Sequence, residues 1–305
     1  AFSNGADLVK IQTYEPKDIT LDIKNKKFKI KKGIWKDKYL WDLYKQACTP
    51  FNWHADAFKI AKKFNKIIFS SPFSLRAVDF LEKFNVPIYK IASFEITDYK
   101  LINYVASKNK PIIISTGMAS LKEVKNAIRI INKYHNKIII LHCVSGYPTK
   151  LKDTNLARIK LLKKKFKKYM IGISDHTDNL TSTIASIPLG IVAIEKHYKL
   201  DNKISTTDSK FSIIPSELNK VKKIIDDLDL SLNKKTKNQF EVESKKLRRS
   251  IFAVKNIKKG EKFSEDNINT LRPNIGICAS KYFFVIGKKA KKKIKAGTAI
   301  TNNYL

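Results

Sequence analysis

The stretch PIIISTGMASLKEVKNAIRIINKYHNKIIILHCVSG, residues 111–146, contains the unit from which the fold of this 305-residue chain is built. Its two apolar, β-branched runs, Pro111–Thr116 and Ile138–Val144, each have the length of a buried strand. Between them, Leu121–Tyr134 has the pattern of a helix. A strand, a helix and a second strand in this order form a βαβ unit, whose strands pair in parallel. The stretch therefore predicts a parallel sheet covered by helices.

The same alternation continues along the chain in both directions. Five further strand-sized runs are Leu8–Thr13, Ile67–Ser71, Tyr89–Ser93, Ile171–Ser174 and Ala193–His197. Helical patterns between or after the runs include Ala55–Phe64, Leu75–Phe84, Asn179–Leu189 and a final amphipathic segment, Pro215–Leu230. Seven strands alternating with helices predict an α/β fold, a TIM (β/α)₈ barrel that lacks its first strand in this chain.

The character of the sequence changes after this barrel region. Residues 233–247 include a polar run of Lys, Asn and Thr that is typical of a linker. Residues 248–305 hold short strand-like pieces and turn signals such as Lys259-Gly260 and Ala296-Gly297, in too little sequence for a large core. We therefore expect a barrel domain over residues 1–232, a linker over 233–247 and a small β-rich domain over 248–305.

The strongly basic composition raises the question of a polyanionic partner. The chain has 61 Lys and Arg against 27 Asp and Glu, a formal net charge of +34. Nearly all of the basic residues are Lys, and they are spread over almost every predicted helix rather than gathered in an aromatic-lined patch, so we expect no nucleic-acid partner. A non-enzymatic protein that binds a polyanion through Lys288–Lys295 remains the alternative from a different class.

Other features of the composition indicate a cytoplasmic protein. No run approaches the roughly 18 consecutive apolar residues of a membrane-spanning helix, so we expect no membrane partner. The sequence begins at Ala1 without the pattern of a signal peptide. Cys48, Cys143 and Cys278 lie far apart without metal-ligand spacing, which favours free thiols in a reducing compartment.

Two histidines end consecutive predicted strands. In a (β/α)₈ barrel the carboxyl ends of the strands meet at the mouth where the chemistry takes place, so His176 and His197 should lie side by side there. Two imidazoles suit a divalent metal in an open site, which polarises a carbonyl oxygen as a Lewis acid. Asp175 and Glu195 flank the pair and are candidates to orient it.

Lysine and hydroxyl side chains end the other strands. Positive charge and hydroxyl donors together match a ligand that carries both a phosphate and a carboxylate, as phosphoenolpyruvate does. A competing use of Lys10 or Lys90 is Schiff-base aldol chemistry, which leaves the two histidines without a role. The residues of this set are Lys10, Ser71, Lys90, Ser93, Ser115 and Thr116.

Five ordered motifs resemble the sialic acid synthase family of phosphoenolpyruvate-dependent nonulosonic acid synthases. They are SSPF at 70–73, YKIASFEITD at 89–98, ISTGM at 114–118, SDHT at 174–177 and EKH at 195–197. In the C-terminal part, RSI at 249–251, VKNIKKG at 254–260 and LRP at 271–273 are similar to that family's antifreeze-like (SAF) domain. The resemblance covers essentially the whole chain.

The resemblance implies an enzyme and its site residues. It implies a TIM barrel followed by a SAF domain, Mn²⁺ or Mg²⁺ as cofactor, and a domain-swapped homodimer. Phosphoenolpyruvate would condense with the open-chain aldehyde of an amino sugar, and phosphate would leave. The implied catalytic residues are His176, His197, Lys90 and Tyr147, of which the two histidines are the metal ligands. The implied substrate-binding residues are Lys10, Ser71, Ser93, Ser115, Ser145, Ser174, Asp208 and, donated across the dimer, Arg272.

Within the family, three phrases are most similar to the members that make pseudaminic acid: FEITD at 94–98, TPFNWH at 49–54 and DSKFS at 208–212. The implied sugar is 2,4-diacetamido-2,4,6-trideoxy-altropyranose, and N-acetylneuraminate and legionaminate synthases are the alternatives. The family's opening strand with its acidic residue has no counterpart here, which predicts an unpaired sheet edge and one carboxylate fewer. Residues 205–207, Ser-Thr-Thr, stand where many members carry Gly-Pro, which predicts a different loop before Asp208.

Overall fold

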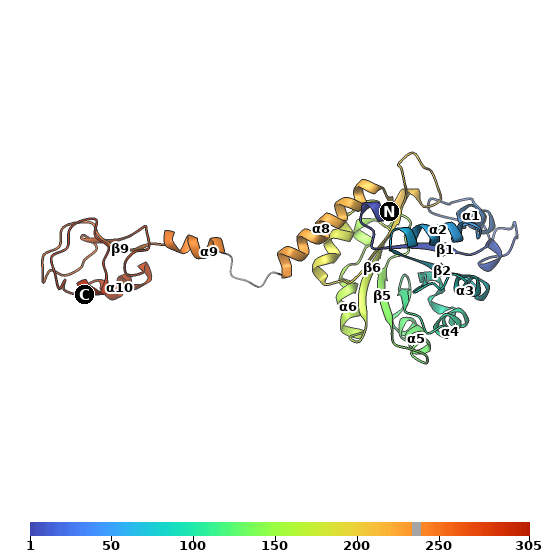
Figure 1. Cartoon of the computed structure of the whole chain (residues 1–305), viewed down its shortest axis with the longest axis horizontal. Helices are drawn as coiled ribbons and strands as arrows, with labels where there is room; N and C mark the ends of the chain where they lie inside the picture. Colours follow the sequence, from blue (N-terminus) through green and yellow to red (C-terminus); the bar gives the residue numbers. More distant parts are fainter. Residues whose placement is uncertain (234–238) are drawn as a thin grey trace. The chain divides into compact units, whose positions relative to one another are not determined.

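The computed structural model describes residues 1–233 and 239–305 (Figure 1). Contacts divide the chain into two compact units, Ala1–Leu232 and Asn233–Leu305, and each is described here by itself. Residues 234–238 of the predicted linker lie outside the described residues. Its remainder includes helix α9, Gln239–Ser244, and a 3₁₀ turn at Lys245–Leu247, so the predicted linker is partly helical.

The first unit is built on a parallel sheet of eight strands whose spatial order follows the chain. The strands are β1 Leu8–Thr13, β2 Ile67–Pro72, β3 Tyr89–Ile91, β4 Ile112–Ser115, β5 Ile138–Cys143, β6 Met170–Asp175, β7 Ile194–Tyr198 and β8 Ser212–Ile213. The first seven correspond to the seven predicted strands. Strand β8 was not predicted, because two residues are too few to form a recognisable pattern.

Helices follow the strands in βα order and lie around the sheet (Figure 1). They are α1 Leu40–Ala47, α2 Trp53–Lys63, α3 Leu75–Glu82, α4 Tyr99–Ala106, α5 Leu121–Ile131, α6 Ala157–Lys165, α7 Thr181–Ser186 and α8 Pro215–Asn233. Local sequence defines the start of α5: Ser120 Oγ accepts from the Glu123 N–H, and the Glu123 carboxylate accepts from the Ser120 N–H at 2.7 Å. This reciprocal cap satisfies backbone donors that the helix leaves free. Among the described residues, no helix is long and apolar enough to cross a membrane.

The sheet curls into an incomplete barrel. Six strand spacings separate β1 from β7, or roughly 29 Å in a flat sheet. Yet Lys10 Nζ of β1 lies 3.6 Å from Glu195 Oε2 of β7. Among the described residues no ladder joins β1 to β8. The predicted fold class, an incomplete (β/α)₈ barrel, is thereby confirmed, although the sheet has eight strands where seven were predicted.

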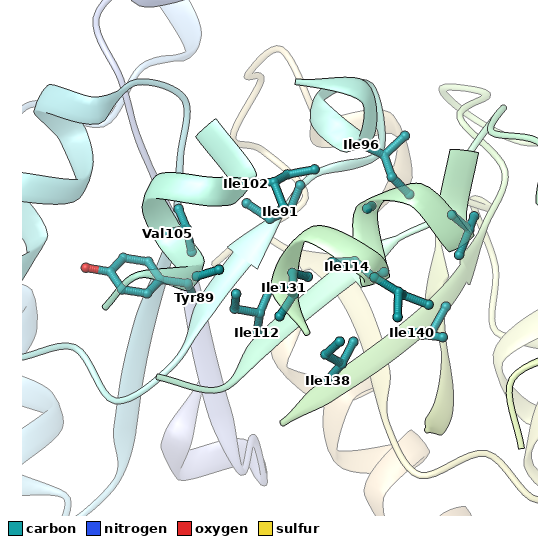
Figure 2. Packing of buried hydrophobic residues seen from close by; sticks show 14 of the residues in the cluster. Tyr89, Ile91, Ile96, Ile102, Val105, Ile112, Ile114, Ile131, Ile138 and Ile140 are labelled. Atoms are coloured by element: carbon teal, nitrogen blue, oxygen red, sulfur yellow. The ribbon is translucent and has the colours of Figure 1, made fainter. Parts of the chain in front are cut away.

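Alternation along the strands separates a packed outer face from an inner face. Ile112 and Ile114 of β4 point outward and share one buried cluster with Val105 of α4 and Ile131 of α5 (Figure 2). Burying each such side chain stabilises the fold by about 1.5–3 kcal/mol. Ile113, between them, belongs to a small inner cluster with Phe69 and Leu141. The inner residues nearer the strand ends are polar, and these form the site.

The second unit is small and has its own core. Strand β9, Ser250–Ala253, pairs antiparallel with β10, Ile268–Leu271. Isolated antiparallel bridges and the short helix α10, Tyr282–Val285, complete it. Ile251, Phe263, Val285 and Ile300 are each at most 1% exposed within one cluster. The antiparallel sheet confirms the β character predicted for the C-terminal domain.

Candidate functional site

Polar residues of the inner face contact the carboxylate of Glu195, which lies on β7. Its Oε1 lies 3.2 Å from Lys90 Nζ of β3, and its Oε2 lies 3.6 Å from Lys10 Nζ of β1. Ser174 of β6 donates to Oε1 at 2.7 Å. Three predicted site residues, the catalytic Lys90 and the substrate-binding Lys10 and Ser174, therefore meet at a carboxylate that was predicted to orient the histidines. We call Lys10, Lys90, Ser174 and Glu195 the inner cluster.

The inner cluster carries an excess of positive charge. Burial alone would raise the pKa of Glu195, but Lys10 and Lys90 outweigh it and hold that pKa well below its usual range. Burial lowers the pKa of Lys90, and Glu195 opposes this effect. Lys90 is only 2% exposed. With two lysines facing one carboxylate, N–H donors remain for an anion.

Hydroxyl groups without partners lie at the end of β4. Ser115 Oγ and Thr116 Oγ1 are buried and have no hydrogen-bond partner among the described residues. Leaving such a group unpaired costs about 1–3 kcal/mol, so these oxygens point to a ligand. Ser71 differs, because its hydroxyl donates to the Lys90 carbonyl at 3.0 Å and holds β3 in place.

A second pair of hydroxyls lies beside Gly117. Ser93 Oγ and Ser145 Oγ are 2.9 Å apart. A Cβ on Gly117 would lie 2.4 Å from Ser93 Cβ and 2.7 Å from Ser145 Oγ, so a side chain there would push the two serines away. Gly117 also has a φ of +45°, which favours glycine. The glycine of the STGM motif thus permits the approach of the two hydroxyls.

The two histidines face each other with ring centroids 5.3 Å apart. His176 Nδ1 lies 3.2 Å from the Val144 carbonyl, and His197 Nδ1 lies 3.3 Å from Asp208 Oδ2. In a neutral imidazole, such an acceptor favours the proton on Nδ1 and leaves Nε2 with the lone pair that a metal requires. Burial, and then the charge on His197, lower the pKa of His176 to about 3, so its imidazole is neutral near pH 7.

This arrangement fits a divalent metal held by two protein donors. Neutral rings whose Nδ1 is bound to a carbonyl or a carboxylate are the usual form of metal-ligating histidines. Among the described residues, no group of three or more His, Cys, Asp or Glu side chains is placed to hold a metal. A divalent cation held by His176 and His197 would keep positions free for water and substrate.

Aromatic rings pack against the two histidines. The Tyr147 ring lies 4.7 Å from the His176 ring, and the Phe211 ring lies 4.8 Å from the His197 ring. Burial raises the pKa of Tyr147, so its hydroxyl stays protonated. Trp35 extends this wall, with its ring 5.4 Å from Tyr147. Trp35 and Phe211 were not predicted, because both lie in connections whose folding no periodic pattern reveals.

Glu95 is a further residue that the sequence did not single out. It lies in the 3₁₀ turn Ser93–Thr97, and its buried Oε2 has no hydrogen-bond partner among the described residues. Burial raises the pKa of Glu95 to about 7, although the charge on Lys90 acts in the opposite direction. Its position two residues after Ser93, at a strand end, was the only signal available.

Two candidates lie elsewhere. Asp175 points away from the histidines, because neighbours along a strand face opposite sides, and its Oδ2 lies 3.1 Å from Lys196 Nζ. Asp208, rather than Asp175 or Glu195, is the carboxylate that contacts a histidine. Arg272 follows β10 in the second unit and is exposed there.

An incomplete (β/α)₈ barrel with lysines, hydroxyl groups and two adjacent histidines at the ends of its strands is typical of an enzyme. Comparison with known proteins makes the class specific. The model of the NeuB family matches residues 1–237, and that of the SAF domain matches residues 248–305. The chain belongs to the NeuB family and ends in a SAF domain.

The similarity to individual proteins extends over nearly the whole chain. The pseudaminic acid synthase of Helicobacter pylori is 40% identical, over 98% of this chain and 88% of the relative. An N,N'-diacetyllegionaminic acid synthase of Campylobacter jejuni is 36% identical, over 97% and 90%. The crystal structure of spore coat polysaccharide biosynthesis protein SpsE from Bacillus subtilis is similar with a TM-score of 0.64 and 30% identity, over 99% and 87%.

Proposed function

We propose that this protein is a pseudaminic acid synthase, a transferase that condenses phosphoenolpyruvate with 2,4-diacetamido-2,4,6-trideoxy-altropyranose. The observation that carries the proposal is the inner cluster, in which two lysines face one half-buried carboxylate beside the histidine pair. The identity of 38–40% to three pseudaminic acid synthases supports this sugar. The legionaminate synthase at 36% identity makes its sugar the second candidate.

Phosphoenolpyruvate would bind on the charged side of the site. Lys10 and Lys90 have donors to spare for its phosphate and carboxylate. Ser115 would donate its unpartnered hydroxyl to the same anion, and Ser93 and Ser145 would add theirs. Ser71 and Ser174 would act by holding Lys90 and Glu195 in place. Electrostatic stabilisation of this kind is usually the largest catalytic contribution.

In the reaction, C3 of phosphoenolpyruvate forms a bond to the aldehyde carbon of the open-chain sugar, and water adds at C2. The bond from C2 to the phosphate oxygen then breaks, which releases phosphate and leaves a 2-keto acid. A Mn²⁺ or Mg²⁺ ion at His176 and His197 would supply Lewis acidity to the aldehyde. Asp208 would keep His197 oriented, and the Tyr147 ring would limit water on the sugar side.

Two further features belong to this proposal. We propose a homodimer in which the SAF domain of one chain, through Arg272, completes the site of the other. This rests on the family resemblance and on the exposure of Arg272. A cytoplasmic location also remains a prediction.

The test is phosphate release from phosphoenolpyruvate with Mn²⁺, with the altrose derivative, the legionaminic precursor and N-acetylmannosamine offered in parallel. We expect release with the altrose derivative at the highest kcat/KM. Highest activity with the legionaminic precursor would change the assigned sugar. Trapping of a lysine by borohydride in the presence of substrate would instead favour Schiff-base chemistry. No release with any sugar would reject the synthase assignment for this chain.

A further inference from the structure

The connection from β7 to β8 carries the carboxylate that contacts His197. Residues 199–211, which we call the β7–β8 loop, include Asp208, whose Oδ2 lies 3.3 Å from His197 Nδ1. Two planar peptide groups meet at the Cα of Asp208, and their positions set the direction in which its side chain projects. The carbonyl of the second peptide group accepts from the Ser212 hydroxyl at 2.8 Å. The first peptide group carries the carbonyl of Thr207, so Asp208 is fixed from both sides only where that carbonyl is held as well.

Trp35 holds the Thr207 carbonyl from a distant part of the chain. Its indole N–H donates to that carbonyl at 2.9 Å. Trp35 belongs to a hairpin, residues 28–40, in the connection from β1 to α1, and an antiparallel bridge between Lys29 and Tyr39 closes this hairpin. The indole donor thus lies on a scaffold that has its own backbone hydrogen bonds.

The Trp35 ring also packs against the two rings that contact the histidines. Its centroid lies 6.3 Å from that of Phe211, whose ring lies 4.8 Å from the ring of His197. It lies 5.4 Å from the centroid of Tyr147, whose ring lies 4.7 Å from the ring of His176. These separations are within the range of attractive aromatic pairs. Trp35 is therefore linked to each histidine through one intervening ring.

We propose that Trp35 is a positioning residue for the divalent metal that His176 and His197 would hold under the proposed function. Its indole N–H fixes the peptide group before Asp208, and Asp208 in turn contacts the Nδ1 of His197. In a neutral imidazole this contact leaves Nε2 with the lone pair that a metal requires. Replacing a group that orients a metal-ligating histidine typically lowers metal affinity about 10–100-fold. Because Trp35 acts on such a group and not on the histidine itself, we expect the lower end of this range.

The first test is the Kd for Mn²⁺, measured by calorimetry without substrate for the wild type and matched variants. Trp35→Phe keeps a ring and removes the indole N–H, whereas Trp35→Ala removes both. Trp53→Phe is the control, because Trp53 is 62% exposed on α2. We expect the Kd to rise about tenfold in Trp35→Phe, at least as much in Trp35→Ala, and to keep the wild-type value in Trp53→Phe. An unchanged Kd in both Trp35 variants would overturn the proposal.

A double-mutant cycle separates positioning through Asp208 from a general loss of structure. In an Asp208→Ala background the contact with His197 is already absent, so adding Trp35→Phe should change the Kd for Mn²⁺ by less than about twofold. A tenfold rise of the Kd in both backgrounds would show that Trp35 does not act through Asp208, and would also overturn the proposal.

The wild type provides a test that does not depend on the folding of any variant. Coupling is reciprocal, so a metal that binds better when the Thr207 carbonyl is held must in turn strengthen the hold on the hairpin. Saturating Mn²⁺ should therefore slow the amide hydrogen exchange of residues 28–40, although they include none of the proposed metal ligands, and leave that of helix α2 unchanged. Mass spectrometry measures both segments, and equal exchange of the hairpin with and without Mn²⁺ would contradict the role of Trp35.

The same measurements distinguish this role from the proposed reaction. Mn²⁺ affinity that depends on Trp35, in a protein that releases no phosphate with any sugar, would support the role of Trp35 and reject the reaction. Absence of Mn²⁺ binding by the wild type would overturn the metal site and the role of Trp35 together.

Discussion

Two acid–lysine groups are centred on neighbouring register positions of β6 and β7, on opposite faces of the sheet. Ser174 pairs in register with Glu195, and the next pair along is Asp175 with Lys196. Glu195 faces inward toward Lys10 and Lys90, while Asp175 and Lys196 face outward toward α7. The two groups are one residue apart in register. Their difference therefore shows which contacts suit a structural role and which suit a functional one.

The outer pair is saturated with hydrogen bonds. Asp175 accepts from the Thr177 N–H at 2.9 Å, the Thr177 hydroxyl at 3.1 Å and the Thr183 hydroxyl at 2.5 Å, besides Lys196 at 3.1 Å. Lys196 also donates to the Thr177 carbonyl at 2.8 Å. The inner cluster has one carboxylate for two lysines, so some of its N–H donors have no acceptor within the cluster. An ion pair whose donors and acceptors are all used stabilises the local fold, whereas a cluster with unused donors can bind a ligand.

The largest expected effect concerns the stability of the outer pair. Asp175→Asn should lower the free energy of unfolding by about 3–5 kcal/mol, because it leaves Lys196 buried without its counter-charge. Urea denaturation followed by tryptophan fluorescence measures this, since Trp35, Trp41 and Trp53 all lie in the first unit. Asp226→Asn, in an exposed pair with Lys222, should change it by less than about 1 kcal/mol. If Asp175→Asn lowered the free energy of unfolding by a similarly small amount, the outer pair would be no more stabilising than an exposed pair.

The next effect is on catalysis by the inner cluster. Lys90→Met should lower kcat/KM for phosphoenolpyruvate by about 10²–10³-fold, through the loss of one charged donor. Its stability should be unchanged or higher, because a desolvated cation is replaced by an apolar chain while Glu195 keeps Lys10. Lys196→Met is the matched variant and should instead be destabilised. Equal destabilisation of the two variants would make the inner cluster structural too.

A somewhat smaller effect concerns the metal. Mn²⁺ at 100 times its Kd should raise the free energy of unfolding by about 2.7 kcal/mol. His176→Ala and His197→Ala should each abolish this gain, and His135→Gln, outside the site, should retain it. Thermal or urea unfolding with and without Mn²⁺ measures the difference. A gain that persists in both alanine variants would place the metal elsewhere.

The smallest expected effect concerns Glu95, whose pKa is raised more by burial than it is lowered by the charge on Lys90. Because its pKa of about 7 lies above the unfolded value, its stabilising contribution is full below about pH 4.5 and is lost as pH rises through 7. Glu95→Gln should remove this dependence and exceed the wild type in stability at pH 8 by about 1–2 kcal/mol. Urea denaturation from pH 4.5 to pH 8 gives the profile. A wild type that gains stability over this range through Glu95 would contradict the assignment.

Much of the fold could be predicted because it depends on local periodicity. The seven apolar runs were long enough to show their strands, whereas β8 has two residues and α9 lies in a segment whose composition resembles a linker. Their position at strand ends also placed Lys10 and Lys90 at one mouth, and the family resemblance added Ser174. The sequence did not indicate which carboxylate would pair with which cation. In the structure Glu195 pairs with the two lysines, and Asp208 contacts His197.

The sequence by itself determined the βα order, the family and the strand-end residues, because these follow from patterns of a few to some thirty residues. Only the tertiary structure decided the partners across the barrel. Glu195 meets Lys10 from the opposite end of the sheet, and Trp35 meets Thr207 across 172 positions of the chain. Such contacts depend on how far the sheet curls and where long connections return, and no local pattern encodes either.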